Sequence, residues 1–243
     1  MRIALFLALL AAAVSAAASP PSINVGPLFD YLQPANSNLL KRIRNTGEGT
    51  AYVRIEVTRM QFDAAGKVTE FPVDTTSLAR NVAGAQGVIA SPSRLIIAAN
   101  GQQATRLVHR GDRNEEQYYR LRFIPVAPTA EEFSLTEEQA RAAVEVTSSI
   151  QVFTGFGTIM FVAPDNVRYD TRIEGNRIQN EGNATIVLDN MRQCDRAAPD
   201  ICDAGVLVHV RPGRSHVLAE DPARFHRFEL MEGGSRRNID SRR

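Results

Sequence analysis

The sequence predicts an all-β protein, in which two immunoglobulin-like β-sandwiches follow an N-terminal export signal. Apolar residues alternate with polar ones over short segments, turn residues separate these segments, and no long helical pattern lies between them. The 243 residues are 44% hydrophobic and 23% charged, which is ordinary for a folded protein. This composition excludes a disordered chain, a collagen and a multispan membrane protein.

The first eighteen residues have the pattern of a signal peptide. Arg2 is the only charged residue among them, residues 3–18 are almost wholly apolar, and the run ends in three alanines, a small-residue site suited to cleavage. Its 16 residues fall short of the ~20 that a membrane-spanning helix needs. We therefore expect residues 1–18 to be removed on export; an uncleaved N-terminal anchor is the alternative.

The first domain is predicted to occupy residues 19–163. In residues 51–58, every second residue from Ala51 to Val57 is apolar and faces one way, and the residues between them face the other way. Asn100-Gly101 is a strong signal for a β-hairpin. Strands are expected at residues 39–44, 51–58, 95–97, 102–108 and 117–124.

A polar, acidic segment interrupts this pattern at residues 128–143. It predicts a long mobile connection, in which Thr136 and Gln139 are spaced to cap a short helix. Residues 144–152 then alternate again, and four apolar side chains share one face: Val144, Val146, Ile150 and Val152. Alternation alone also permits an ordinary strand that packs inside the first domain's own core.

A second, smaller β-sandwich is predicted at residues 164–234, after the boundary marked by Pro164-Asp165-Asn166. The final residues, 235–243, are polar and net positive, and we expect them to form a disordered tail. Strands of the second domain are expected at residues 167–173, 177–179, 184–191 and 206–210.

The chain has two cysteines, Cys194 and Cys202, both in the second domain. In an oxidising compartment, cysteines this close in the sequence can pair across a hairpin or loop. Closing so short a loop would stabilise the fold by about 2.5 kcal/mol in the chain-entropy model. Two unpaired buried thiols are the alternative, and a zinc site is disfavoured because no histidines are suitably spaced.

Charge and motifs argue against catalysis and against a nucleic-acid partner. The formal net charge is only +1, far from the basic character of nucleic-acid binders. The sequence contains no P-loop and no Gly-x-Ser-x-Gly elbow, and its four histidines show no helical zinc spacing. We therefore expect no enzyme activity, no cofactor, no metal, no nucleotide and no nucleic acid.

Three stretches of the first domain, taken in order, resemble the PapD-like periplasmic pilus chaperones of the chaperone–usher pathway. Residues 92–108 resemble that family's run of a proline, a short strand, a turn and a strand ending in Arg-Leu-Val. Residues 116–126 resemble its next strand, and residues 128–152 its F–G loop and donor strand G. The second domain, with its cysteine pair, looks most like the alternate branch that assembles alpha-type fimbriae.

This resemblance implies two immunoglobulin-like domains joined at an angle, with a cleft between them, in a periplasmic protein. It implies that the protein captures a fimbrial subunit lacking one strand, supplies strand G in its place, and hands the subunit to an outer-membrane usher. The donor side chains would be Val144, Val146, Ile150 and Val152. A structural or adhesive β-sandwich component of a surface appendage is the alternative function.

One feature of the family is missing at its usual place. Family members carry basic residues near the first strand and on strand G, where they anchor the subunit's terminal carboxylate, but residues 25–33 and 144–164 contain none. Arg120 and Arg122, on the polar face of residues 117–124, could replace this anchor. Further candidates are Lys41, Arg42 and Arg44, and each of these charges could instead be an ordinary solvated one.

Overall fold

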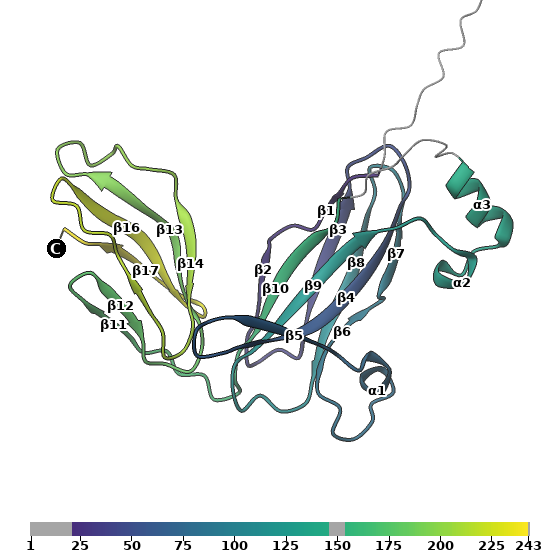
Figure 1. Ribbon diagram of the computed structural model, residues 1–243, viewed down its shortest axis with the longest axis horizontal. Coiled ribbons are helices and arrows are strands. Elements are labelled where there is room, and N and C mark those ends of the chain that lie inside the picture. Colours follow the sequence, from purple (N-terminus) through teal and green to yellow (C-terminus); the bar gives the residue numbers. More distant parts are fainter. Residues whose placement is uncertain (1–20, 146–153, 243) are drawn as a thin grey trace, which may run out of the picture.

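The computed structural model describes residues 21–145 and 154–242, so the predicted signal peptide lies outside the described residues. These residues form two lobes joined at an angle, each made mainly of antiparallel strands (Figure 1). The predicted all-β architecture of two immunoglobulin-like β-sandwiches is confirmed.

The first lobe is a sandwich of two sheets. One has the strand order β1-β3-β8-β6, and the other has the order β2-β10-β9-β4-β5, with β7 also paired to β4. The strands are β1 (Ile23–Asn24), β2 (Phe29–Leu32), β3 (Asn38–Asn45), β4 (Ala51–Phe62), β5 (Val68–Pro72), β6 (Gly87–Ser91), β7 (Arg94–Ile97), β8 (Gln102–Arg110), β9 (Gln117–Pro125) and β10 (Phe156–Val162).

The core of this lobe follows the period-2 pattern of the sequence. On β4, Ala51 and Val53 are fully buried, and on β9, Tyr119, Leu121 and Phe123 are fully buried as well. Their neighbours along each strand point to the outer face of the sheet. The side chains of β4 and β9 that share one face in the sequence pattern are therefore the buried ones, as predicted.

The Asn100-Gly101 pair makes a turn, but the hairpin prediction is wrong. Asn100 adopts a positive φ of 56°, as the turn requires. The flanking strands do not pair with each other: β7 pairs with β4, whereas β8 pairs with β3 and β6. The turn carries the chain from one sheet of the sandwich to the other, which a dipeptide signal does not distinguish from a hairpin.

The second lobe contains a sheet of order β11-β12-β15 and a sheet of order β14-β13-β16-β17. A disulfide joins Cys194 to Cys202, so the predicted pairing is confirmed. The strands are β11 (Thr171–Glu174), β12 (Arg177–Asn180), β13 (Ile186–Asp195), β14 (Val206–Val210), β15 (Ser215–Val217), β16 (Arg224–Glu232) and β17 (Ser235–Asp240).

The predicted disordered tail is a strand for most of its length. Residues 235–240 form β17, which pairs antiparallel with β16. Its charges have partners, since Arg236 lies 2.6 Å from the Glu229 carboxylate and Arg227 lies 3.5 Å from that of Asp240. A polar, charged strand suits the exposed edge of a sheet, so composition alone was a poor guide here.

In residues 21–145 and 154–242, three short helices accompany the strands: α1 (Thr75–Ala79), α2 (Ala130–Phe133) and α3 (Glu137–Glu145). The predicted cap is present, because Gln139 N donates to Thr136 Oγ1 at 3.1 Å and Thr136 N donates to Gln139 Oε1 at 2.9 Å. The connection predicted to be mobile is thus largely helical in its described part.

Helix α3 also corrects the predicted start of the donor strand. Val144, expected to be extended, lies in the last turn of α3 and is 46% exposed. Val146, Ile150 and Val152 lie outside the described residues. The next described strand is β10, which begins at Phe156.

We predict that replacing both cysteines, Cys194→Ser with Cys202→Ser, lowers the free energy of unfolding by about 2.5 kcal/mol. The loss follows from the greater freedom of the unfolded chain once the loop between them is open. Urea denaturation followed by circular dichroism measures this change. An unchanged unfolding midpoint would contradict the prediction.

Candidate functional site

Strand β10 has an edge that is paired along only part of its length. On one side it pairs with β9 from Phe156 to Val162, and on the other it pairs in parallel with β2 only from Ile159 onward. Ile159 N donates to Leu28 O at 2.9 Å. On the β2 side of residues 156–158, no strand of the described chain pairs with β10. This open edge directly follows residues 146–153.

The side chains of β10 divide into two faces. Thr158, Met160 and Val162 are fully buried in the sandwich. Ile159 and Phe161 alternate with them and point to the outer face of the sheet. The strand therefore belongs to the core on one face, and on the outer face Ile159 is half-buried while Phe161 is buried against the second lobe.

The two predicted anchor residues, Arg120 and Arg122, lie together on this outer face and share one carboxylate. Arg122 Nη2 lies 2.6 Å from Glu70 Oε2, and Arg120 Nε lies 3.3 Å from Glu70 Oε1. A Cβ atom added at Gly157 would lie 3.7 Å from Arg120 Cδ, so Arg120 packs next to β10, although β9 pairs with β10 on the side opposite the open edge. The structure thus brings these arginines together, but with Glu70 of β5 between them.

Glu70 shows that a carboxylate fits this position. Its burial by itself would raise the pKa of Glu70, but the hydrogen bonds from Thr58 and Arg122 and the two guanidinium charges hold this pKa below its usual value. Thr58 Oγ1 donates to Glu70 Oε2 at 2.7 Å. The sequence offered no signal for Glu70, because nothing links it to Arg122, 52 residues away.

Lys41, another candidate anchor, instead forms a buried ion pair with Asp30. It is only 3% exposed, and its Nζ atom donates to Pro27 O and, at 2.8 Å, to Asp30 Oδ2. Burial raises the pKa of Asp30, although Lys41 opposes this shift. This buried pair ties β3 to the start of β2, the strand that flanks β10. Arg42 and Arg44 lie exposed on β3, in the opposite sheet.

Helix α2 is docked against the outer face of β4 and β7. The ring of Phe133 meets that of Tyr52 edge-on, with centroids 5.3 Å apart, and Phe133 is buried. Glu132 lies 3.5 Å from both Arg54 and Arg94. These contacts fix the first half of the connection between β9 and β10.

A cluster of aromatic and polar residues joins the two lobes near β10. The rings of Phe161 and His209 stack with centroids 4.7 Å apart, and the Tyr31 hydroxyl lies 2.6 Å from His209 Nε2. Burial lowers the pKa of His209 to about 4, so at neutral pH the uncharged ring shares a single hydrogen bond with the Tyr31 hydroxyl. Sequence reasoning missed the cluster, because Tyr31 and His209 are 178 residues apart.

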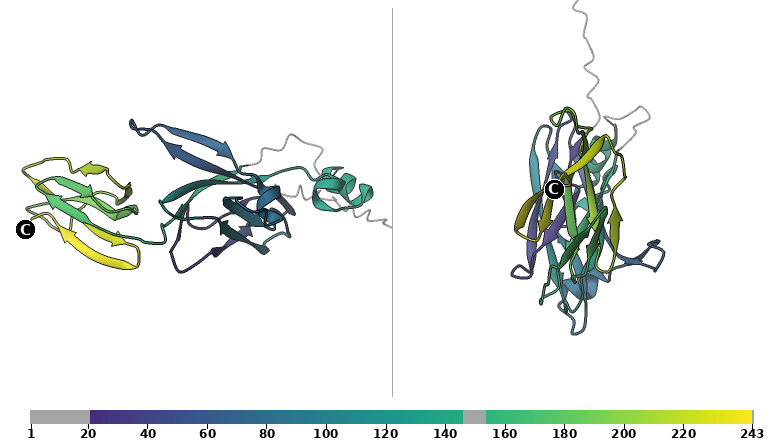
Figure 2. Two further views of the ribbon diagram at one scale, coloured as in Figure 1. Left: turned by 90° about the horizontal axis from the view of Figure 1, so that it is seen from below. Right: turned by 90° about the vertical axis from the view of Figure 1, so that its left-hand side faces the viewer.

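Two further contacts hold the lobes at their angle. The Glu116 carboxylate accepts hydrogen bonds from Thr185 N at 2.9 Å and Thr185 Oγ1 at 2.6 Å; burial raises the pKa of Glu116, although these bonds oppose the shift. The β4–β5 hairpin projects toward the second lobe (Figure 2). There the guanidinium of Arg211 lies 3.6 Å from the ring centroid of Phe62.

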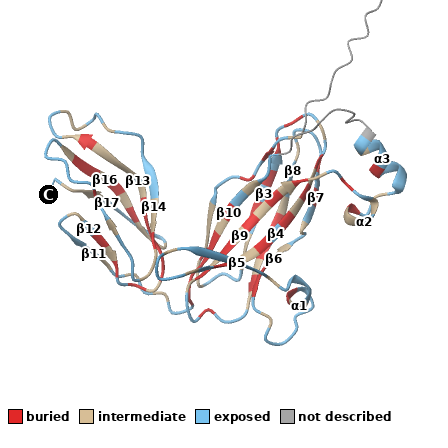
Figure 3. Ribbon diagram, in the orientation of Figure 1, coloured by how far each residue is buried: buried red, intermediate tan, exposed pale blue. Residues whose placement is uncertain are grey.

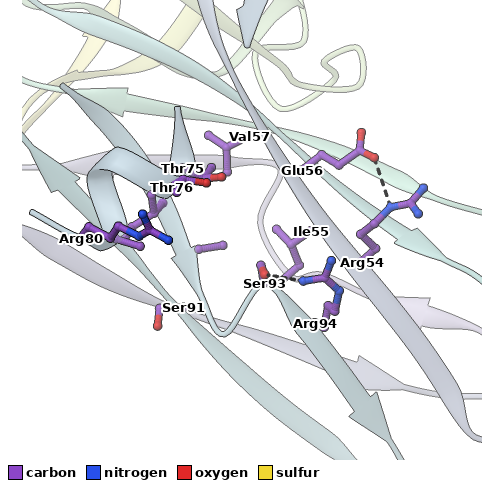
Figure 4. Close-up of a pocket in the computed structure, with 13 residues that line it drawn as sticks. Arg54, Ile55, Glu56, Val57, Thr75, Thr76, Arg80, Ser91, Ser93 and Arg94 are labelled. Carbon is purple, nitrogen blue, oxygen red and sulfur yellow. Dashed lines mark hydrogen bonds and ion pairs between the residues drawn. The ribbon is translucent and has the colours of Figure 1, made fainter. Parts of the chain in front are cut away.

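A pocket of about 570 Å³ lies between β4, α1, β6 and β7 (Figure 4). Arg80 and Arg94 approach it from opposite sides, over a floor that includes Ile55 and Val57. None of its lining residues is a histidine or a cysteine, and its one carboxylate, Glu56, lies 3.2 Å from Arg54 Nε. The hydroxyl groups that line the pocket, those of Thr75, Thr76, Ser91 and Ser93, therefore have no histidine beside them in the lining.

Neither a metal cluster nor a membrane helix occurs in the described parts of the chain. Within residues 21–145 and 154–242, no three His, Cys, Asp or Glu side chains are grouped so as to hold a metal ion. In the same residues no helix is long and apolar enough to cross a bilayer.

Similar proteins are named as fimbrial chaperones. A probable fimbrial chaperone EcpB of Klebsiella pneumoniae subsp. pneumoniae is 26% identical over 212 residues, which is 87% of this chain and 86% of the relative. The probable fimbrial chaperone EcpB of Escherichia coli O157:H7 is 24% identical over 195 residues, or 80% of this chain and 78% of the relative. No protein-family model matches the chain.

Solved structures share the fold. The class 5 fimbriae chaperone CfaA superposes with a TM-score of 0.54 at 18% identity, covering 90% of this chain and 98% of CfaA. A chain of the CsuC–CsuE chaperone–tip adhesion subunit complex from Acinetobacter baumannii superposes with a TM-score of 0.51 at 14% identity, covering 91% and 97%. The resemblance seen in the sequence is therefore confirmed, while the likeness to the alpha-type branch stays a prediction.

We predict that lowering the pH from 6.5 to 4 destabilises the wild type more than His209→Gln. In this range the unfolded chain protonates His209 but the folded protein does not, because its pKa is lowered to about 4. The stabilisation is thus fully present above pH 6.5 and lost as the pH falls through 4. Allowing for the partial exposure of the ring, the difference should reach about 1–2 kcal/mol.

Urea denaturation at several pH values measures this difference, and the other histidines cancel because both proteins contain them. The glutamine introduced by His209→Gln keeps an acceptor for Tyr31 but does not titrate. Equal pH dependence in the two proteins would contradict a buried neutral His209.

Proposed function

Because the sequence and fold of this chain match those of PapD-like pilus chaperones, we propose that it is a periplasmic chaperone for fimbrial subunits. It captures subunits that lack one strand, lends them a strand of its own, and hands them to an outer-membrane usher. The observation that carries this proposal is the open edge of β10 at residues 156–158, immediately after the alternating segment 144–152.

The open edge and the alternating segment meet two needs of an incomplete subunit. Such a subunit exposes apolar core and unpaired backbone, which is an aggregation hazard. An extended strand supplies backbone partners and places every second side chain in the groove. Burial of Val144, Val146, Ile150 and Val152 would contribute on the order of 6–12 kcal/mol before ordering costs.

Donation requires a small change in α3. Val144 and Glu145 form its last turn, and they must become extended if Val144 is to enter the subunit. Helix ends fray readily, because their last carbonyl groups have no partner within the helix. The docked α2, held by Phe133 and Glu132, keeps the other end of the connection in place.

Arg120 and Arg122 are the proposed anchor for the subunit's terminal carboxylate. Two guanidinium groups on β9, the strand next to β10, suit a carboxylate, and Glu70 already occupies that role within the chain. The subunit's carboxylate would take the place of Glu70. Since the side chains of Arg120 and Arg122 are 29% and 38% exposed, this anchor adds specificity more than affinity.

Location and chemistry fit the same proposal. The predicted signal peptide and the disulfide support an oxidising compartment, which for this pathway is the periplasm.

We propose that the protein acts without catalysis, with later folding of the subunit as the source of free energy. The structural or adhesive alternative is not favoured, since the relatives are named chaperones. The domain boundary between residues 163 and 164 belongs to the proposal, and the second domain includes β17, which the predicted limit at residue 234 left out.

We predict that Ile150→Asp or Val152→Asp abolishes capture of a fimbrial subunit that the wild type binds, while circular dichroism stays that of the wild type. A carboxylate cannot enter the subunit's apolar groove without a large desolvation cost. Co-expression and size-exclusion chromatography detect the 1:1 complex. Val82→Asp, at a 51% exposed valine away from this segment, is the matched control. Unfolding of the two variants would mean that the segment is ordinary core.

We predict that Arg122→Met weakens subunit binding up to about fivefold, and that Glu70→Gln strengthens it by freeing both arginines. Titration calorimetry with the purified subunit measures both changes. Arg42→Met, on the opposite sheet, is the charge-matched control. If Arg122→Met and Arg42→Met bind equally well, the arginine pair is not the anchor.

A further inference from the structure

The second lobe exposes an apolar sheet edge, made of β14 and the residues just before it. Three large apolar side chains lie along residues 201–210: Ile201 is 68% exposed, Val206 52% and Leu207 41%. β14 pairs with β13 on one side, and on its other side no strand of the described chain pairs with it. We call residues 201–210 the β14 edge. Figure 3 shows the exposed stretch of β14.

The β14 edge is firmly attached to the lobe. The disulfide binds Cys202 to Cys194 on β13, Asp203 N donates to Gln193 O at 2.9 Å, and Val206 lies opposite Met191. The exposed apolar residues are therefore held in a fixed, extended arrangement along β13. Proteins usually avoid such edges, because unpaired backbone beside apolar side chains invites pairing with another chain.

The strand β14 faces the inner side of the angle between the lobes (Figure 1). The ring of His209 packs against Phe29 of β2 and Phe161 of β10, with centroids 4.4 and 4.7 Å apart. Leu207 lies two residues before His209, so its side chain leaves β14 on the same side. The exposed side chain of Leu207 thus lies two residues from the aromatic contact between the two lobes.

No unpaired charge on the β14 edge opposes contact with an apolar partner. Asp203 is the one acidic residue between Cys202 and Val210, and its carboxylate lies 2.7 Å from Arg224 Nη2. The hydrogen bond from Arg224 lowers the pKa of Asp203, so this ion pair persists at neutral pH. Residues 204–210 carry no formal charge once His209 is neutral.

We infer that the β14 edge is a second docking strip for the subunit held at β10. This inference rests on the proposed function and adds a role for the second lobe. A subunit seated at the open edge of β10 lies on the inner side of the angle, within reach of Leu207. Its apolar groove rim and unpaired backbone match an apolar, half-paired edge. Contact at two lobes slows dissociation, because both must release together.

The test compares Leu207→Asp and Ile201→Asp with Val217→Asp. Val217 is 51% exposed and lies on β15, in the other sheet of the same lobe. Each variant is co-purified with the subunit, and dissociation is followed by exchange with labelled wild-type protein. The 1:1 complex should still form, but the Leu207 and Ile201 variants should release the subunit about tenfold faster than Val217→Asp. Leu207→Ser, a milder change, serves if an aspartate impairs folding.

Hydrogen exchange gives a second readout, in which subunit binding should protect the amides of residues 204–210. Release at the rate of Val217→Asp, with no protection of these amides, would overturn the inference while leaving capture at β10 intact. A change confined to self-association of the free protein would also overturn it, since the edge would then join two copies of this chain. Failure of the wild type to bind any subunit would instead overturn the proposed function.

Discussion

The structure depends on one constraint, which is that β10 is paired on both sides for only part of its length. β9 covers one side from Phe156 to Val162, but β2 reaches the other side only at Ile159. An open strand edge is normally a liability in a soluble protein. Here the strand itself is firmly held, because the side chains of Thr158 and Met160 are fully buried in the core. The edge is therefore held in position while it remains open to a partner.

Other contacts preserve the geometry around this edge. The buried Lys41–Asp30 pair ties β2, the strand that flanks β10, to β3. Removing one member would leave a buried charge unpaired, which is far more costly than losing a surface ion pair. The cluster of Tyr31, Phe161 and His209 then sets the second lobe against the same two strands. The paired arginines and Phe161 thus share the outer face of one sheet, and His209 of β14 packs on Phe161.

Patterns among neighbouring residues in the sequence predicted the features that depend only on neighbouring residues. Alternation identified the buried faces of β4 and β9, and the Thr136–Gln139 cap was correctly predicted. The same approach was wrong for the tail, because pairing with β16 outweighs the polar composition of residues 235–240. It was also wrong for Val144, where a helix overrides strand-like alternation. Glu70 and His209 could not be predicted, since their partners are distant in the sequence.

A crystal structure of the protein bound to its fimbrial subunit would test the central claim most directly. The account predicts that residues 144–152 continue β10 as an extended strand inside the subunit's groove, with the apolar side chains of Val146, Ile150 and Val152 surrounded by subunit atoms. It would be contradicted if this stretch packed within its own sandwich and the subunit bound elsewhere on the molecule.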